Sequence, residues 1–134
     1  MNNKYSLPKD GGLIAKSAPR DIIHRYEKIR TNVYENEYRA VQYVADNIVR
    51  AIRNYNAHCS NGVYDETRPF VLGLTTGRTP LGLYSELVKR HKEGQISFRN
   101  VAVFSLDEFY PIRSTEQQSR NYRIHEEFLN HIDI

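Results

Sequence analysis

Two short segments of the sequence combine residue types that could bind or transform a charged substrate. The first is the run Thr75, Thr76, Gly77, Arg78 and Thr79. Its hydroxyls can donate hydrogen bonds to an anion such as phosphate, and a glycine lets the backbone approach the anion closely. Arg78 is either a further, charged phosphate donor or a side chain in solvent. The segment therefore predicts either an anion-binding loop or a plain turn that binds nothing.

The second segment is the acidic pair Asp107 and Glu108 in "LDEFY". Adjacent side chains at the end of an extended strand point to opposite sides, so one carboxylate can face a cleft while the other packs or forms an ion pair. A carboxylate in a cleft can accept a proton or bind a metal ion, but no His or Cys stands at ligand spacing beside this pair. We expect no metal and no cofactor. The alternative to proton transfer is a pair of solvated carboxylates.

The elements around these segments predict that the two lie together. Pro69–Leu74 and Asn100–Leu106 are short, nearly continuous apolar runs, as in strands buried on both faces. Between them we predict a helix that is capped by Thr79 and ends at Gly94. A strand, a helix and a strand in this order form parallel strands, so both segments follow strands at the same sheet edge. Ligands of open α/β sheets bind at that edge.

The rest of the chain predicts supporting elements. Lys28–Glu35 alternates apolar and polar residues, as in a half-exposed strand, and a long amphipathic helix follows with Asn36 as its N-cap. We expect Cys59 in a polar surface loop and a further helix over Ser119–Asn130. Residues 1–27 are expected to form a partly flexible leader, and residues 28–134 the domain.

Composition and charge exclude several functions. The 134 residues are 40% hydrophobic and 26% charged, which suits one globular domain. The net charge of +3 comes from 19 basic and 16 acidic residues spread along the chain, without the clustered basic face of a nucleic-acid-binding protein. No apolar run reaches the roughly 18 residues that span a bilayer, and Met1 to Arg20 lacks the apolar stretch of a secretory signal peptide. Because Cys59 is the single cysteine, we expect a cytoplasmic protein without an internal disulfide. We also expect a homo-oligomer.

The segment "FVLGLTTGRTPLGLYSELVKRHKEGQISFRNVAVFSLDEFYPI" resembles the glucosamine-6-phosphate deaminase family. The family pattern is close to "LGLPTGGTP", a helix, "VSF", a strand and "MDEY". The resemblance continues into "HIDI" and covers about Ile29–Ile134. The wider superfamily also contains 6-phosphogluconolactonases and sugar-phosphate-sensing domains of bacterial repressors. The resemblance implies a three-layer, Rossmann-like α/β fold with a mostly parallel sheet, present here as its N-terminal portion.

The resemblance also implies roles for the two segments. In deaminases the Asp of "MDEY", here Asp107, removes the C2 proton of an open-chain amino sugar phosphate and returns it at C1. Glu108 belongs to the same catalytic motif. The loop of residues 75–79 then helps to hold the phosphate of the substrate, a phosphorylated amino sugar.

The chain differs from the family pattern in three residues and in length. Arg78 replaces a second glycine, Thr75 a proline and Phe109 a tyrosine. Family members are nearly twice as long, and their ring-opening histidine lies in a later "GxGxDGHxAFNEP" segment that this sequence lacks. We therefore expect residues 1–134 alone to be inactive. A non-catalytic sugar-phosphate sensor and a 6-phosphogluconolactonase-like hydrolase are the alternatives.

Overall fold

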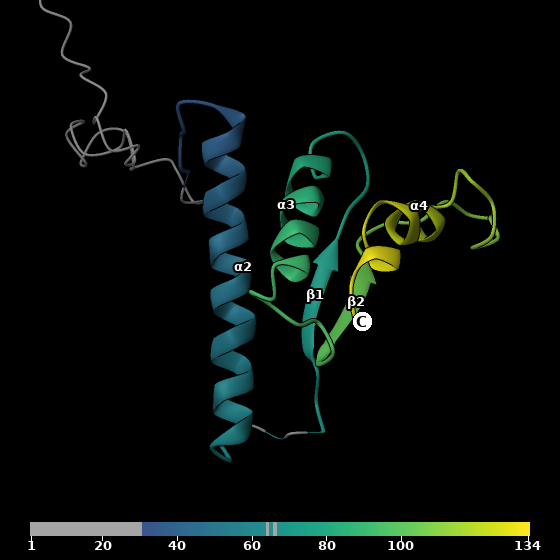
Figure 1. The fold of residues 1–134 in the computed structure, drawn as a ribbon. Helices are drawn as coiled ribbons and strands as arrows, with labels where there is room; N and C mark the ends of the chain where they lie inside the picture. Colours follow the sequence, from purple (N-terminus) through teal and green to yellow (C-terminus); the bar gives the residue numbers. More distant parts are fainter. Residues whose placement is uncertain (1–30, 64, 66) are drawn as a thin grey trace, which may run out of the picture. The chain divides into compact units, whose positions relative to one another are not determined.

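The structure, a computed structural model, describes residues 31–63, 65 and 67–134 (Figure 1). Its elements in chain order are α2 (Glu37–Ser60), β1 (Phe70–Leu74), α3 (Leu81–Lys92), β2 (Val101–Ser105), α4 (Arg120–Glu127) and the 3-10 helix η2 (Leu129–His131). The chain divides into two compact units, residues 1–41 and 42–134, and the second unit contains both strands. The predicted leader and the boundary after residue 27 lie outside the described residues.

The two strands confirm the predicted strand–helix–strand unit. β1 and β2 are parallel, with Phe70 opposite Val101 and Leu74 opposite Ser105. The backbone N–H of Leu106 extends the pairing by donating to the Leu74 carbonyl at 2.8 Å. Because parallel strands end on the same side, the segments after Leu74 and after Ser105 leave the sheet at one edge.

A buried arginine joins α2 to α3. Arg90 on α3 is 8% exposed, and its guanidinium donates to Glu86 at 2.8 Å on its own helix. It also reaches Asp46 at 2.6 Å and Gln42 at 2.8 Å, both on α2. A buried guanidinium requires such partners, because leaving one unpaired is costly. The contact therefore fixes how the two helices meet.

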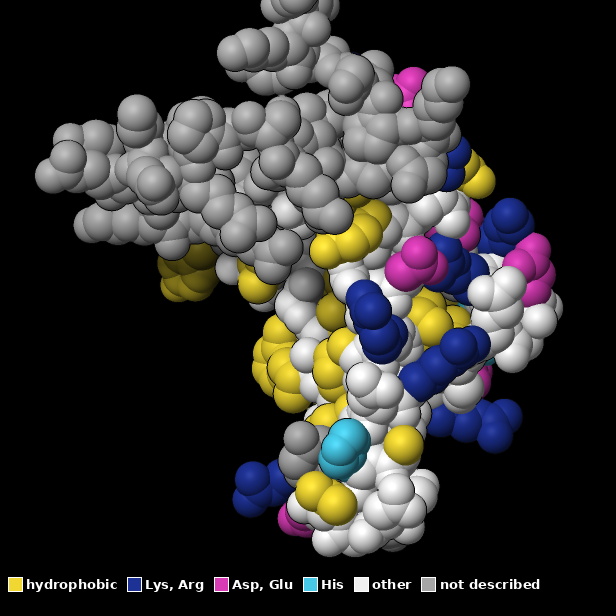
Figure 2. Space-filling model, turned by 90° about the vertical axis from the view of Figure 1, so that its left-hand side faces the viewer, with side chains coloured by type: hydrophobic (Ala, Val, Ile, Leu, Met, Phe, Trp, Pro, Cys, Tyr) yellow, Lys and Arg dark blue, Asp and Glu magenta, His cyan; other side chains and the backbone are white. Residues whose placement is uncertain are grey.

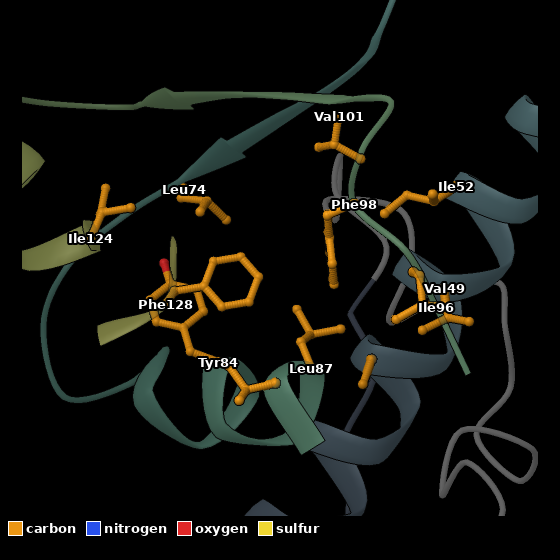
Figure 3. Close-up of a cluster of buried hydrophobic side chains, with 12 residues drawn as sticks. Val49, Ile52, Leu74, Tyr84, Leu87, Ile96, Phe98, Val101, Ile124 and Phe128 are labelled. Atoms are coloured by element: carbon orange, nitrogen blue, oxygen red, sulfur yellow. The ribbon is translucent and has the colours of Figure 1, made fainter. Parts of the chain in front are cut away.

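The hydrophobic core contains side chains from α2, α3 and α4 and from the inner side of both strands (Figure 3). Three aromatic rings lie in it: Tyr84 stacks on Phe128 at 5.1 Å between ring centroids, and Phe98 meets Phe128 edge-on at 5.5 Å. Such ring pairs stabilise a core beyond their buried area. The other well-buried members include Val49, Ile52, Leu74, Leu87 and Ile124.

The expectation that both strands are buried on both faces is wrong for the described residues. Val71 on β1 and Phe104 on β2 are each 61% exposed, and Leu106 just beyond β2 is 72% exposed. Alternate residues of a strand point to opposite faces, so one face of the sheet packs on the core while the other is open. An added Cβ at Gly73 would stand 3.0 Å from Leu106, whose side chain thus lies across this open face.

Three further expectations differ from the structure, while the helix starts at Asn36 and Ser119 are confirmed. Residues 31–34 form no strand, so the strand predicted over Lys28–Glu35 is wrong where it can be seen. Asn36 caps α2 by accepting a hydrogen bond from Arg39 N–H at 3.0 Å. α2 continues to Ser60, so Cys59 is a buried helical residue and not part of a surface loop. The third difference is the cap of α3, which belongs to the site.

Candidate functional site

The loop after β1 turns sharply into α3 at Gly77. Gly77 has a φ of 118°, a backbone conformation that L side chains rarely adopt, with open space where a Cβ would stand. Pro80, and not Thr79, is the N-cap of α3, and no side chain caps the helix. The predicted Thr79 cap is therefore wrong. Because Thr79 is exposed and makes no capping bond, its hydroxyl remains able to meet a ligand.

A buried tyrosine anchors this loop to the core. Tyr84 on α3 donates a hydrogen bond from its hydroxyl to the backbone carbonyl of Thr75. Burial raises the pKa of that hydroxyl, which therefore stays protonated and acts as a donor. Thr75 is exposed, while Thr76 and Gly77 are half-buried. The start of the loop is thus held in place, and its remaining residues border solvent.

Glu108 holds the N-terminus of α4. Its carboxylate accepts hydrogen bonds from the backbone N–H groups of Arg120 at 2.9 Å and Asn121 at 3.0 Å, and from the Ser119 hydroxyl at 2.8 Å. Backbone donation from Arg120 and then Asn121 is the main cause that lowers the pKa of Glu108 to about 2. The first N–H groups of a helix have no partner within the helix, so an ionised carboxylate there stabilises it. In the structure Glu108 supports α4 and does not face the loop of residues 75–79.

Asp107 points to a different partner, the side chain of Arg120. Arg120 Nε donates to Asp107 Oδ2 at 3.2 Å, and the Asp107 side chain is 54% exposed. No hydrogen bond among the described residues involves Asp107 Oδ1. The two neighbouring carboxylates therefore diverge, as the strand geometry predicts. One supports a helix, and the other keeps an oxygen open to the edge of the sheet.

Arg120 also reaches the loop after β1. A terminal nitrogen of its guanidinium donates to Thr76 Oγ1 at 2.7 Å. The same guanidinium lies 4.5 Å from the centre of the Phe109 ring, a cation–π contact. One side chain thus joins the two segments that the sequence singled out, and places the loop of residues 75–79 next to Asp107.

Sequence reasoning missed Arg120, although a signal was present. It follows the cap residue Ser119 and begins α4. A cation in the first turn opposes the positive end of the helix dipole, so an arginine there needs anionic partners nearby. Asp107 and Glu108 are the acidic residues that meet this requirement.

Other candidate chemistry is sparse in the described part of the chain. No three His, Cys, Asp or Glu side chains in it are close enough to hold a metal ion. His91 lies near Asp133, with 3.4 Å between its Nδ1 and Asp133 Oδ1, and not at the carboxyl end of either strand. Arg78 is exposed, and its side chain forms no hydrogen bond or ion pair within the described residues. None of the helices described combines the length and apolar character needed to cross a bilayer. On the face drawn in Figure 2, basic, acidic and apolar side chains are mixed.

Fold and site together define an α/β protein with a parallel sheet whose carboxyl edge carries a hydroxyl-rich loop and an open carboxylate. Residues 43–134 match the family described as glucosamine-6-phosphate isomerases/6-phosphogluconolactonase. The chain belongs to this family, and its α/β class with a parallel sheet is confirmed.

Several named proteins are similar to the chain. A glucosamine-6-phosphate deaminase of Treponema denticola is 52% identical over 50% of the chain and 25% of that protein. A glucosamine-6-phosphate isomerase of Candida albicans is 35% identical over 79% of the chain and 38% of that protein. A solved structure of a monomeric glucosamine-6-phosphate deaminase superposes with a TM-score of 0.61 at 28% identity, over 73% of this chain and 36% of that one. The chain thus spans between a quarter and two fifths of the length of these relatives.

Proposed function

We propose that this chain is part of an enzyme that deaminates glucosamine 6-phosphate. The observation that carries the proposal is the Arg120 guanidinium, which contacts both Asp107 and Thr76. It brings a carboxylate able to accept a proton next to a loop suited to phosphate. The names of the relatives support the same activity. The substrate is a phosphorylated amino sugar in its open-chain form.

Asp107 is the proton acceptor in this proposal. Its free Oδ1 removes the C2 proton of the open-chain amino aldehyde, and the electron pair of that C–H bond forms the C1–C2 double bond while the aldehyde oxygen takes up a proton from water. Asp107 then returns its proton to C1, which leaves a protonated C2 imine, and this group gives one proton back to the hydroxide left by that water. Water adds to the imine and ammonia leaves, so glucosamine 6-phosphate and water give fructose 6-phosphate and ammonia. A positioned carboxylate is suited to such a transfer.

The loop of residues 75–79 binds the phosphate. Thr76 Oγ1 accepts a hydrogen bond from Arg120, so its own hydroxyl hydrogen is free to donate to a phosphate oxygen. Gly77 keeps the backbone open to close approach, and Thr79 and Arg78 are exposed beside it. The positive end of α3, which no side chain caps, adds to the attraction for an anion.

Ammonia release tests the proposal. The assay should use the full-length protein, meaning the natural chain that contains residues 1–134, because the relatives are longer than this segment. We expect ammonia and fructose 6-phosphate in equal amounts from glucosamine 6-phosphate, and none from N-acetylglucosamine 6-phosphate, whose nitrogen is an amide. We expect the 134-residue chain alone to be inactive.

The same experiment separates the alternatives. Tight binding of glucosamine 6-phosphate without ammonia release would point to a sugar-phosphate sensor. Hydrolysis of 6-phosphogluconolactone without ammonia release would point to a lactonase. Either result would overturn the deaminase assignment.

The setting of the enzyme is part of the proposal. We infer that it serves amino-sugar catabolism in the cytoplasm, because its substrate is a phosphorylated intracellular metabolite and its relatives are metabolic enzymes. A homo-oligomer remains a prediction, and the solved relative described as monomeric shows that a protein of this activity can also act as a single subunit.

A further inference from the structure

Two contacts hold Arg120 in addition to its side-chain bonds to Asp107 and Thr76. Glu108 accepts a hydrogen bond from its backbone N–H at 2.9 Å, and the Phe109 ring lies 4.5 Å from its guanidinium carbon. The Arg120 side chain is 25% exposed. A guanidinium that is fixed in this way can hold other groups in place, because little of its own freedom remains to be lost on binding them.

The two groups that Arg120 holds are the ones the reaction needs. Its Nε contacts Asp107 Oδ2, and a terminal nitrogen contacts Thr76 Oγ1. These partners precede it in the chain by 13 and 44 residues, so no local backbone geometry sets their separation. The bond to Oδ2 restrains the Asp107 carboxylate, and Oδ1 accepts no hydrogen bond within the described residues.

We propose that Arg120 is a positioning residue, which fixes the Asp107 carboxylate at a set distance from the phosphate-binding loop. The inference rests on the proposed function, because it presumes that Asp107 moves the proton and that the loop binds the phosphate. The rate of proton transfer falls steeply when the donor and the acceptor are misplaced by about an ångström. Arg120 therefore acts on the rate through Asp107 and contributes little to substrate affinity.

A double-mutant cycle in the full-length protein tests this role. Arg120→Met removes the charge and keeps much of the side-chain length, so we expect kcat to fall by about 10- to 100-fold with KM changed less than about threefold. In an Asp107→Asn background, Arg120→Met should lower kcat by less than about threefold further, because Arg120 then has no proton-accepting carboxylate to position. Equal losses in both backgrounds, or a raised KM with an intact kcat, would show that Arg120 acts on the substrate itself.

Two further variants serve as controls. Arg99→Met breaks the ion pair of an exposed arginine with Asp133 at 3.5 Å, before β2 and so at the other end of the strand from Asp107, and kcat should stay within about twofold of the parent. Arg120→Lys keeps the charge but has a single ammonium in place of the fork, so it should recover part of the lost rate. If Arg120→Met fails to fold, the same kinetic comparison can be made with Arg120→Lys. Full activity of Arg120→Lys would contradict the claim that the rate depends on one guanidinium that contacts both Asp107 and Thr76.

A measurement without turnover separates this inference from the proposed function. If the parent protein releases no ammonia, the deaminase assignment fails, and the Thr76 methyl signal in NMR still reports the linkage. Asp107→Asn should shift that signal in the parent and leave it unchanged in the Arg120→Met background. A Thr76 signal that is insensitive to Asp107→Asn in both backgrounds would overturn the positioning role.

Discussion

The Glu108 carboxylate caps the backbone of Arg120, whose side chain turns back to the neighbouring Asp107. Two adjacent acids thus act on one arginine in different ways. Glu108 places the first turn of α4, and Asp107 receives the guanidinium that this turn presents. The division explains why a Glu108 substitution should first affect folding and only then the reaction.

Glu108 should make stability depend on pH in the acidic range. Its pKa is lowered from 4.5 to about 2 in the folded protein, chiefly by the backbone N–H of Arg120. A lowered folded pKa means that the contribution is complete above about pH 4.5 and is lost as the pH falls toward about 2. Glu108→Gln should therefore be less stable than the parent at pH 7, and the difference should shrink over this window. Urea unfolding at several pH values measures it.

Glu116→Gln is the matched control, because Glu116 lies in the same loop and accepts only a long bond from Arg113 N–H at 3.3 Å. The free energy of unfolding of Glu116→Gln should match that of the parent protein at each pH. A stability difference for Glu108→Gln that stays constant down to pH 2 would contradict the capping role.

Arg78 should contribute to phosphate binding, although its side chain makes no hydrogen bond or ion pair within the described residues. Its side chain is exposed beside Gly77, so its guanidinium can donate a charge-assisted hydrogen bond to a phosphate that the loop holds. We expect Arg78→Ala to weaken binding of glucosamine 6-phosphate by about 1–3 kcal/mol. Calorimetric titration measures this, with Arg50→Ala on α2 as a control for the lost charge. Unchanged affinity in Arg78→Ala would place its guanidinium in solvent.

The open sheet face should make the 134-residue chain self-associate. Val71, Phe104 and Leu106 expose apolar side chains on one face of a two-stranded sheet. Exposed apolar patches and free strand edges favour association. Sedimentation velocity should show larger species as concentration rises, and Phe104→Ser combined with Val71→Thr should reduce them. A clean monomer of the parent at high concentration would count against this prediction.

Local patterns were sufficient for the framework of the fold. The apolar runs before Thr75 and Asp107 indicated two strands, and the helix between them indicated a parallel pair with one shared edge. Ser119 marked the start of α4 because its side chain can cap a helix, and it accepts a hydrogen bond from Tyr122 N–H at 3.3 Å. Each of these signals depends on residues within a few positions of one another.

The errors concern features that depend on distant parts of the chain. The burial of β1 and β2 depends on what covers each face, which their apolar sequences do not state. Cys59 is a buried helical residue because α2 continues through a polar stretch as far as Ser60, which the local composition does not indicate. Arg120 contacts Thr76 across 44 residues, a separation that no spacing rule connects. The predicted cap of α3 is instead a local error, because Thr79 has the right type for a cap but the adjacent Pro80 takes that position.

The central claim is that Asp107 moves the proton from C2 to C1. The most direct measurement follows deuterium from C2-deuterated glucosamine 6-phosphate in the full-length protein, together with the kinetics of Asp107→Asn. We expect part of the deuterium to appear at C1 of fructose 6-phosphate, and Asp107→Asn to lower kcat by about 10²–10⁴-fold with little change in KM. An Asp107→Asn protein that keeps the parent kcat and transfers deuterium as before would contradict the account.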